Sequence, residues 1–216
     1  FGQSFFLGLF NPSIRDALSI SHGQFGSIYA SATLLSSFIL VWIGKKIDDI
    51  NILKFASYVV VLLAISCFLF SKISSVIFLF FSIFLMRLSG QGLMSHTATT
   101  TIARFFEKSR GRALSATWLG LSSAEFILPL LIIFLLTFID WQNIWILISI
   151  LVIVVLPIVI FSLVKNVKLD SREVSNIQDV KIKEIKQWKR REVLKDYRFY
   201  IICLSMLAMP WIATGT

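Results

Sequence analysis

The chain is built from long apolar runs that are separated by short polar connections. The first run covers 1–10 and can continue helically past Asn11 and Pro12 to Leu18. The other runs cover 22–44, 55–71, 76–101, 113–136, 144–164 and 197–216. Several of them exceed the ~18 residues that a helix needs to cross a ~30 Å hydrocarbon core. No run shows the alternation that is typical of strands. The pattern predicts an all-α polytopic membrane protein with six spans and the start of a seventh.

The composition supports a membrane location. Of the 216 residues, 56% are hydrophobic and 15% are charged, and the mean hydropathy is +0.82. A soluble domain carries roughly 25% charged residues. Cys67 and Cys203 each stand alone in an apolar run, so we expect two small buried packing residues and no disulfide.

The basic residues gather in alternate connections. The connections after the first, third and fifth runs hold two, and the others hold 17. The two are Arg15 and Lys72, and the 17 are Lys45, Lys46, Lys54, Arg104, Lys108, Arg110, Arg112, Lys165, Lys168, Arg172, Lys181, Lys183, Lys186, Lys189, Arg190, Arg191 and Lys195. The positive-inside rule then places the even-numbered connections in the cytoplasm. This distribution explains the net charge of +9 without a nucleic-acid partner.

The organisation along the chain suggests one complete bundle and part of another. We expect a six-span bundle over 1–164, a basic cytoplasmic linker over 165–196, and the start of a seventh span over 197–216. The linker can be solvated or can form an amphipathic helix along the inner leaflet, and its charge favours the former. Because both ends lie inside apolar runs, we expect that the sequence is a piece of a longer protein.

Two charged residues lie near the predicted bilayer midplane, Arg87 in the fourth run and Glu125 in the fifth. A charge at this depth costs at least ~2.5–3.5 kcal/mol on insertion scales, so it usually faces a partner or a cavity. The two residues can form a structural ion pair, or they can bind a substrate or proton.

Helical spacing extends these two candidates to their neighbours. At ~100° per residue, the residues predicted to share the side of Arg87 are Gln91, Met94, Ala98 and Thr101. The residues predicted to share the side of Glu125 are Trp118, Ser122 and Pro129. Gln91 and Trp118 are therefore added as substrate or coupling candidates. His96 points away from Arg87, and we expect it to be a neutral histidine bonded to a neighbouring helix. No motif for catalysis, metal binding or cofactor binding is present, so we expect neither an enzyme nor a cofactor.

Three motifs carry a family resemblance. The first is Gly44-Lys45-Lys46-Ile47-Asp48-Asp49-Ile50-Asn51 with Lys54 beyond, the second is Arg87-Leu88-Ser89-Gly90-Gln91-Gly92, and the third runs from Arg104 to Leu114. With the six-span layout, they resemble the major facilitator superfamily over essentially the whole chain. The third motif is similar to the branch of monocarboxylate and oxalate/formate transporters. In the first motif, Asp49 stands where the family usually has arginine and Asn51 where it has glycine.

The resemblance implies a secondary transporter in the inner (plasma) membrane that works by alternating access between two bundles. It implies a small organic solute as substrate, with an anion favoured through Arg87, and a coupling proton or counter-substrate. It also implies a gating loop with Gly44, Asp48, Lys54, Arg104 and Arg112, in which Asp48 balances Arg104 or Arg112. The alternatives are proton-coupled efflux of amphipathic compounds and a membrane sensor that does not transport.

Overall fold

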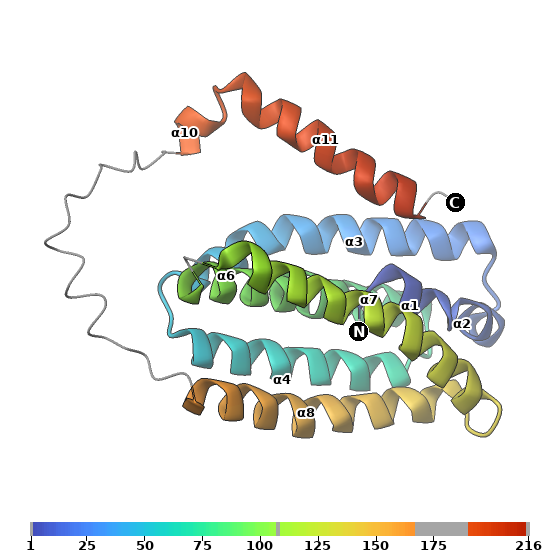
Figure 1. Cartoon of the computed structure of the whole chain (residues 1–216). Coiled ribbons are helices and arrows are strands. Elements are labelled where there is room, and N and C mark those ends of the chain that lie inside the picture. The colour runs from blue at the N-terminus through green and yellow to red at the C-terminus, as the bar shows by residue number, and fades with distance from the viewer. Residues whose placement is uncertain (1, 107–108, 167–189, 215–216) are drawn as a thin grey trace, which may run out of the picture. The chain divides into compact units, whose positions relative to one another are not determined.

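The computed structural model describes residues 2–106, 109–166 and 190–214, and its regular elements there are helices (Figure 1). The chain divides into two compact units, Phe1–Val167 and Lys168–Thr216. The division falls close to the predicted end of the first bundle at residue 164. Each unit is described by itself.

Five helices of the first unit are long and apolar enough to cross a membrane. They are α3 (His22–Gly44), α4 (Ile52–Ser71), the rod Val76–Phe105, α7 (Arg110–Leu136) and α8 (Trp141–Asn166). The rod consists of α5 (Val76–Met86), the π-helix η2 (Arg87–Met94) and α6 (Ser95–Phe105). These helices match the predicted runs from the second to the sixth. The prediction of an all-α polytopic membrane protein is confirmed.

The first predicted run forms two short helices, α1 (Ser4–Gly8) and α2 (Asn11–Leu18), rather than one span. Pro12 explains the break, because it has no backbone N–H and its ring clashes with the carbonyl four residues earlier, that of Gly8. α1 ends at that glycine, and Pro12 lies in the first turn of α2, where proline is tolerated.

Side-chain caps fix the starts of three helices. Ser21 and Gln24 form a capping box at α3, in which the Ser21 Oγ accepts from the Gln24 N–H at 3.2 Å and the Gln24 Oε1 accepts from the Ser21 N–H at 2.8 Å. The side chains of Asn51 and Ser75 accept from backbone N–H groups in the first turns of α4 and α5. These bonds satisfy donors that a helix start would otherwise leave unpaired, so the polar connections end the apolar runs at defined residues.

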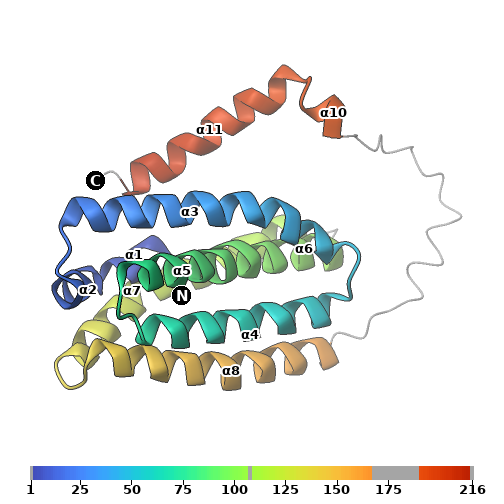
Figure 2. The ribbon, with the colours of Figure 1, turned by 180° about the vertical axis from the view of Figure 1, so that it is seen from behind.

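The buried core lies where α8 packs along α4 and where α5 packs against α3 and α4 (Figures 1 and 2). The fully buried ring of Trp145 on α8 is its centre. The rings of Phe6, Phe10 and Phe70 lie 5.5, 5.0 and 4.5 Å from it, centroid to centroid. Aromatic packing at these distances stabilises the docking of α1 and α2 on α8. Residues 2–10 are thereby held beside the long helices.

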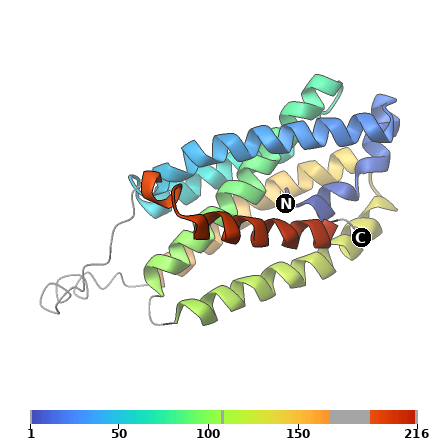
Figure 3. The ribbon, with the colours of Figure 1, turned by 90° about the horizontal axis from the view of Figure 1, so that it is seen from above.

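α7 lies at an edge of the first unit, on the side away from α3 (Figure 3). Most of its residues are exposed, and Ile132 is the one residue of this helix that is buried. Lipid or further protein can cover such an apolar face in a membrane.

The second unit contains α10 (Arg190–Val193) and α11 (Tyr197–Thr214), and α11 corresponds to the seventh predicted run. Most of the predicted linker over 165–196 lies outside the described residues. Cys67 is buried between helices as expected, but Cys203 on α11 is exposed, so the prediction of two buried cysteines is wrong for Cys203.

Candidate functional site

The candidate site lies on η2, in the middle third of the 30-residue rod Val76–Phe105. π-helices are rare and often mark functional sites. Gly90 and Gly92 lie within this segment, and a Cβ at Gly92 would approach a methyl of Leu40 to 3.1 Å. Glycine at this position therefore allows α3 to approach η2 closely.

The π-helix corrects the predicted polar face. That prediction applied an α-helical rotation to the whole run, but a π-helix bonds each N–H to the carbonyl five residues earlier and turns less per residue. Arg87 and Gln91 still lie about one turn apart on one side. Ala98 and Thr101 follow η2. The rotation of 100° per residue that placed them on the same side as Arg87 is therefore wrong, because it does not hold through η2.

Arg87 binds the start of the chain. Its Nη1 donates to the Gly2 carbonyl oxygen at 3.1 Å and to the Ser4 Oγ at 3.3 Å. Its guanidinium carbon lies 5.2 Å from the ring centroid of Tyr29 on α3, within the range of a cation–π interaction. The Tyr29 hydroxyl donates to the same Ser4 Oγ at 2.8 Å. Three parts of the chain, which are residues 2–4, α3 and η2, thus converge on one half-buried arginine.

The other edge of the Arg87 guanidinium has no hydrogen-bond partner in the part of the chain that the structure describes. Within the part of the chain that the structure describes, neither Nε nor Nη2 makes a hydrogen bond, and Nε is buried. The Oε1 of Gln91 is also buried without a hydrogen-bond partner among the described residues. Leaving such groups unpaired costs about 1–3 kcal/mol each, and more for a charged group. A donor edge and an acceptor therefore lie unsatisfied on the same side of η2.

Gly2 allows the contact between the start of the chain and η2. Its φ of +82° lies in the region that favours glycine. A Cβ there would lie 2.5 Å from the Met86 carbonyl oxygen and 3.3 Å from the Gln91 nitrogen. Only a residue without a side chain can bring its carbonyl to Arg87 along this path.

The structure does not bring the fifth-run candidates to Arg87. Trp118 and Glu125 lie on α7 with exposed side chains. Among the described residues, the hydrogen bonds of Arg87 go to Gly2 and Ser4, and not to Trp118 or Glu125. Trp118 and Glu125 therefore remain candidates on sequence grounds.

The predicted gating loop is held by an ion pair. The Nη2 of Arg104 on α6 lies 2.7 Å from the Asp48 Oδ1 and 3.4 Å from the Ile47 carbonyl oxygen. Lys54 lies in the first turn of α4 and Arg112 in the first turn of α7, and both are exposed. Of the two arginines predicted to balance Asp48, Arg104 is the one that contacts it. The gating role itself stays a prediction.

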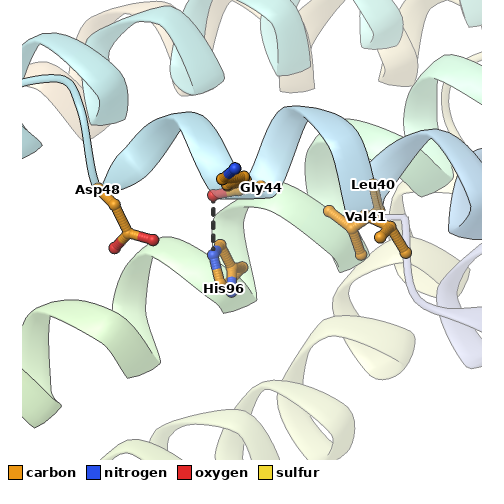
Figure 4. A pocket seen from close by; sticks show the side chains of 6 residues that line it. Leu40, Val41, Gly44, Asp48 and His96 are labelled. Carbon is orange, nitrogen blue, oxygen red and sulfur yellow. Dashed lines mark hydrogen bonds between the residues drawn. The ribbon is translucent and has the colours of Figure 1, made fainter. Parts of the chain in front are cut away.

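His96 joins α6 to the end of α3. Its Nε2 lies 3.1 Å from the carbonyl oxygen of Gly44, the last residue of α3, which confirms the expected bond to a neighbouring helix (Figure 4). A cavity of about 330 Å³ opens beside this bond, and its wall includes Lys45 and Asp48. A Cβ at Gly44 would lie 3.4 Å from the imidazole, so the glycine lets the ring pack closely.

The sequence did not identify Gly2, Ser4 and Tyr29 as site residues. Ser4 and Tyr29 are polar residues inside apolar runs, which is a weak signal in a membrane protein. Their meeting at Arg87 depends on how the first run folds back on η2. Among the described residues, no group of three or more His, Cys, Asp or Glu could hold a metal ion.

Comparison with known proteins gives the family. Residues 1–216 match the family model of the Major Facilitator Superfamily. No curated protein and no solved structure matches the chain. The match covers the whole chain and agrees with the helical fold and its long apolar helices. The chain therefore belongs to the major facilitator superfamily and is a multi-pass membrane transport protein.

Proposed function

We propose that the protein carries a small organic anion across the inner membrane by alternating access, and that Arg87 binds the anionic group. The observation that carries the proposal is the Nε and Nη2 edge of Arg87, which has no hydrogen-bond partner in the described part of the chain. Two parallel N–H groups of this kind match the two oxygens of a carboxylate.

The electrostatics of the site favour an anion over a cation. The groups around Arg87 are a carbonyl, a hydroxyl and an aromatic ring, which solvate the guanidinium but do not neutralise it. A positive charge that lies inside a membrane without a counter-charge is costly. A bound carboxylate would neutralise Arg87, so substrate binding would also remove the free-energy cost of this uncompensated charge.

The gating loop supports alternating access. Gly44, Asp48 and Arg104 lie at the end of the helices that the basic connections predict to be cytoplasmic. The Asp48–Arg104 pair would hold the loop in one state and separate in another. Membership of the monocarboxylate and oxalate/formate branch would agree with an anionic substrate, and it rests on the motif from Arg104 to Leu114 alone.

Glu125 is the proposed site of a coupling proton. It lies on α7 near the predicted bilayer midplane and forms no ion pair with another described residue, so a proton would bind it without breaking such a pair. With an anionic substrate, one proton on Glu125 per cycle would offset the charge that moves.

The test is uptake of radiolabelled short carboxylates by proteoliposomes that contain the protein expressed from its complete reading frame. Arg87→Gln should weaken uptake at low substrate concentration by about 10- to 100-fold, the range for a hydrogen-bonded charge. Arg15→Gln is the matched control, because Arg15 bonds Asn11 within its own helix at 2.9 Å. The proposal fails if carboxylates are not carried while amphipathic cations are, since that result indicates multidrug-type efflux.

A further inference from the structure

We infer that the first unit holds a second binding site, a cavity at its outer end that takes a small primary ammonium ion with a short hydrocarbon chain. The cavity has a volume of about 520 Å³, which lies in the range of roughly 300–1,000 Å³ that is usual for small-molecule sites. Arg87 and the residues that hold it, Gly2, Ser4 and Tyr29, are not part of its wall. The inference therefore goes beyond the proposed function and does not depend on it.

This outer cavity lies between α2 and the turn that joins α7 to α8, which occupy the same end of the unit (Figures 1 and 2). Its wall consists of Ser13 on α2, Leu136 at the end of α7, residues 137–140 of the turn, and Trp141 and Asn143 at the start of α8. The turn follows the fifth predicted run, so the positive-inside rule predicts that it lies outside the cytoplasm. We therefore expect an external solute to reach the outer cavity without crossing the bilayer.

Asp140 gives the outer cavity its charge. Of the described residues that line the cavity, Asp140 alone is charged, and it is exposed. No hydrogen bond or ion pair joins its carboxylate to another residue of the described ranges. The start of α8 contributes a partial positive charge of about half a unit, which reduces the negative charge of Asp140 but does not cancel it. The outer cavity therefore favours a cation.

The polar groups of the wall favour an ammonium ion over a metal ion. A primary ammonium carries three N–H donors and no acceptor. Besides Asp140, Ser13, Thr137 and Asn143 bring oxygen atoms to the wall. The Thr137 Oγ1 donates its proton to the Phe134 carbonyl oxygen at 2.7 Å, which leaves the hydroxyl oxygen as an acceptor. A calcium ion instead takes roughly six to eight oxygen ligands, with carboxylates prominent among them, and the described wall holds a single carboxylate.

The apolar part of the wall favours a short hydrocarbon chain on the ammonium. Leu136, Phe138, Ile139 and Trp141 form this part, and Phe138 is 72% exposed. Aromatic rings attract a cation that lies within about 6 Å of the ring centre, and they also bury hydrocarbon. An alkylammonium can therefore place its charged end at Asp140 and its chain against the rings.

Propylammonium and propanol are the probes, because they have nearly one shape and differ in charge. Their affinities for the purified protein from its complete reading frame, in detergent, are measured by ligand-observed NMR. Propylammonium should bind at least tenfold more tightly than propanol, and Asp140→Asn should weaken its binding by about 10- to 100-fold. Thr137→Val removes one acceptor and keeps the charge, so it should weaken binding by about 2- to 10-fold. High salt should weaken the binding of propylammonium to the wild type, because salt screens exposed charges.

Asp16→Asn is the matched control, because Asp16 is an exposed acid on α2 that is not part of the wall. It should leave the affinity for propylammonium unchanged. Equal affinities for propylammonium and propanol, or no binding of propylammonium, would overturn the inference. Equal loss in Asp140→Asn and Asp16→Asn would also overturn it, because surface charge in general would then explain the binding. If Asp140→Asn unfolds at a lower temperature than wild type, Thr137→Val and the salt dependence of wild type still decide.

Discussion

Replacement of Gly2 by alanine is the sharpest perturbation of the link between the start of the chain and η2. The alanine Cβ would lie 2.5 Å from the Met86 carbonyl oxygen, which belongs to the backbone of a packed helix. Carbon and carbonyl oxygen normally approach no closer than about 3.3 Å, so residue 2 must move away by nearly 1 Å. The Gly2 carbonyl that accepts from Arg87 moves with it.

The size of the effect follows from two contributions. A non-glycine residue at a positive φ, here +82°, costs roughly 1–2 kcal/mol. Loss of the bond between Gly2 and the charged Arg87 costs about 1.5–3 kcal/mol. The sum of about 2.5–5 kcal/mol corresponds to a fall in melting temperature of roughly 5 °C or more for a chain of this size.

The assay is thermal unfolding in detergent together with the affinity for a bound carboxylate. Gly2→Ala should lower the melting temperature and weaken the affinity at least tenfold, because Arg87 is no longer held in place. Gly8→Ala is the matched control, since a Cβ at Gly8 meets no atom within 4 Å. Near the end of α1 it should be neutral or stabilising by up to about 1 kcal/mol. Equal behaviour of the two variants would refute this account of how Arg87 is positioned.

Variants at three further residues test separate parts of the site. Tyr29→Phe removes the bond to Ser4 and keeps the ring beside Arg87, so the affinity for carboxylate should fall no more than about tenfold. Tyr29→Leu also removes the ring, so it should lower this affinity further. A larger loss of affinity in Tyr29→Phe than in Tyr29→Leu would contradict this order. Asp48→Asn breaks an ion pair whose side chains are 67% and 38% exposed, so the melting temperature should change by less than about 4 °C. Labelling of a cysteine on the predicted cytoplasmic side should nevertheless change if the pair gates the loop. Glu125→Gln should bind carboxylate normally and lose acceleration by a proton gradient; unchanged acceleration would remove Glu125 from the coupling step.

The long helices could be predicted from the sequence because lipid imposes simple rules on them. The run predicted over 22–44 has the same bounds as α3. The third, fourth and fifth runs share one end with their helices and differ by a few residues at the other, and the sixth differs by a few residues at both ends. Apolar length sets the extent of a span, and caps such as Ser21 and Asn51 set its start. The break at Gly8 was less clear, since Pro12 can kink a membrane helix or end it.

The site could be predicted only in part. Arg87 was identifiable because a charge inside an apolar run is costly, and Gln91 because it lies one turn away. Gly2, Ser4 and Tyr29 were missed, because their role depends on three segments meeting at one guanidinium. The π-helix was also missed, since the 100° rotation fits either helix type over one turn and fails only farther along.

The central claim is that the free edge of Arg87 binds the anionic group of the substrate. The most direct measurement is an experimental structure of the protein with a bound carboxylate. The account predicts a carboxylate oxygen about 2.7–2.9 Å from the Arg87 Nε, with Nη1 still bonded to Gly2 and Ser4. A carboxylate bound elsewhere, with that Nε still unpaired, would contradict it.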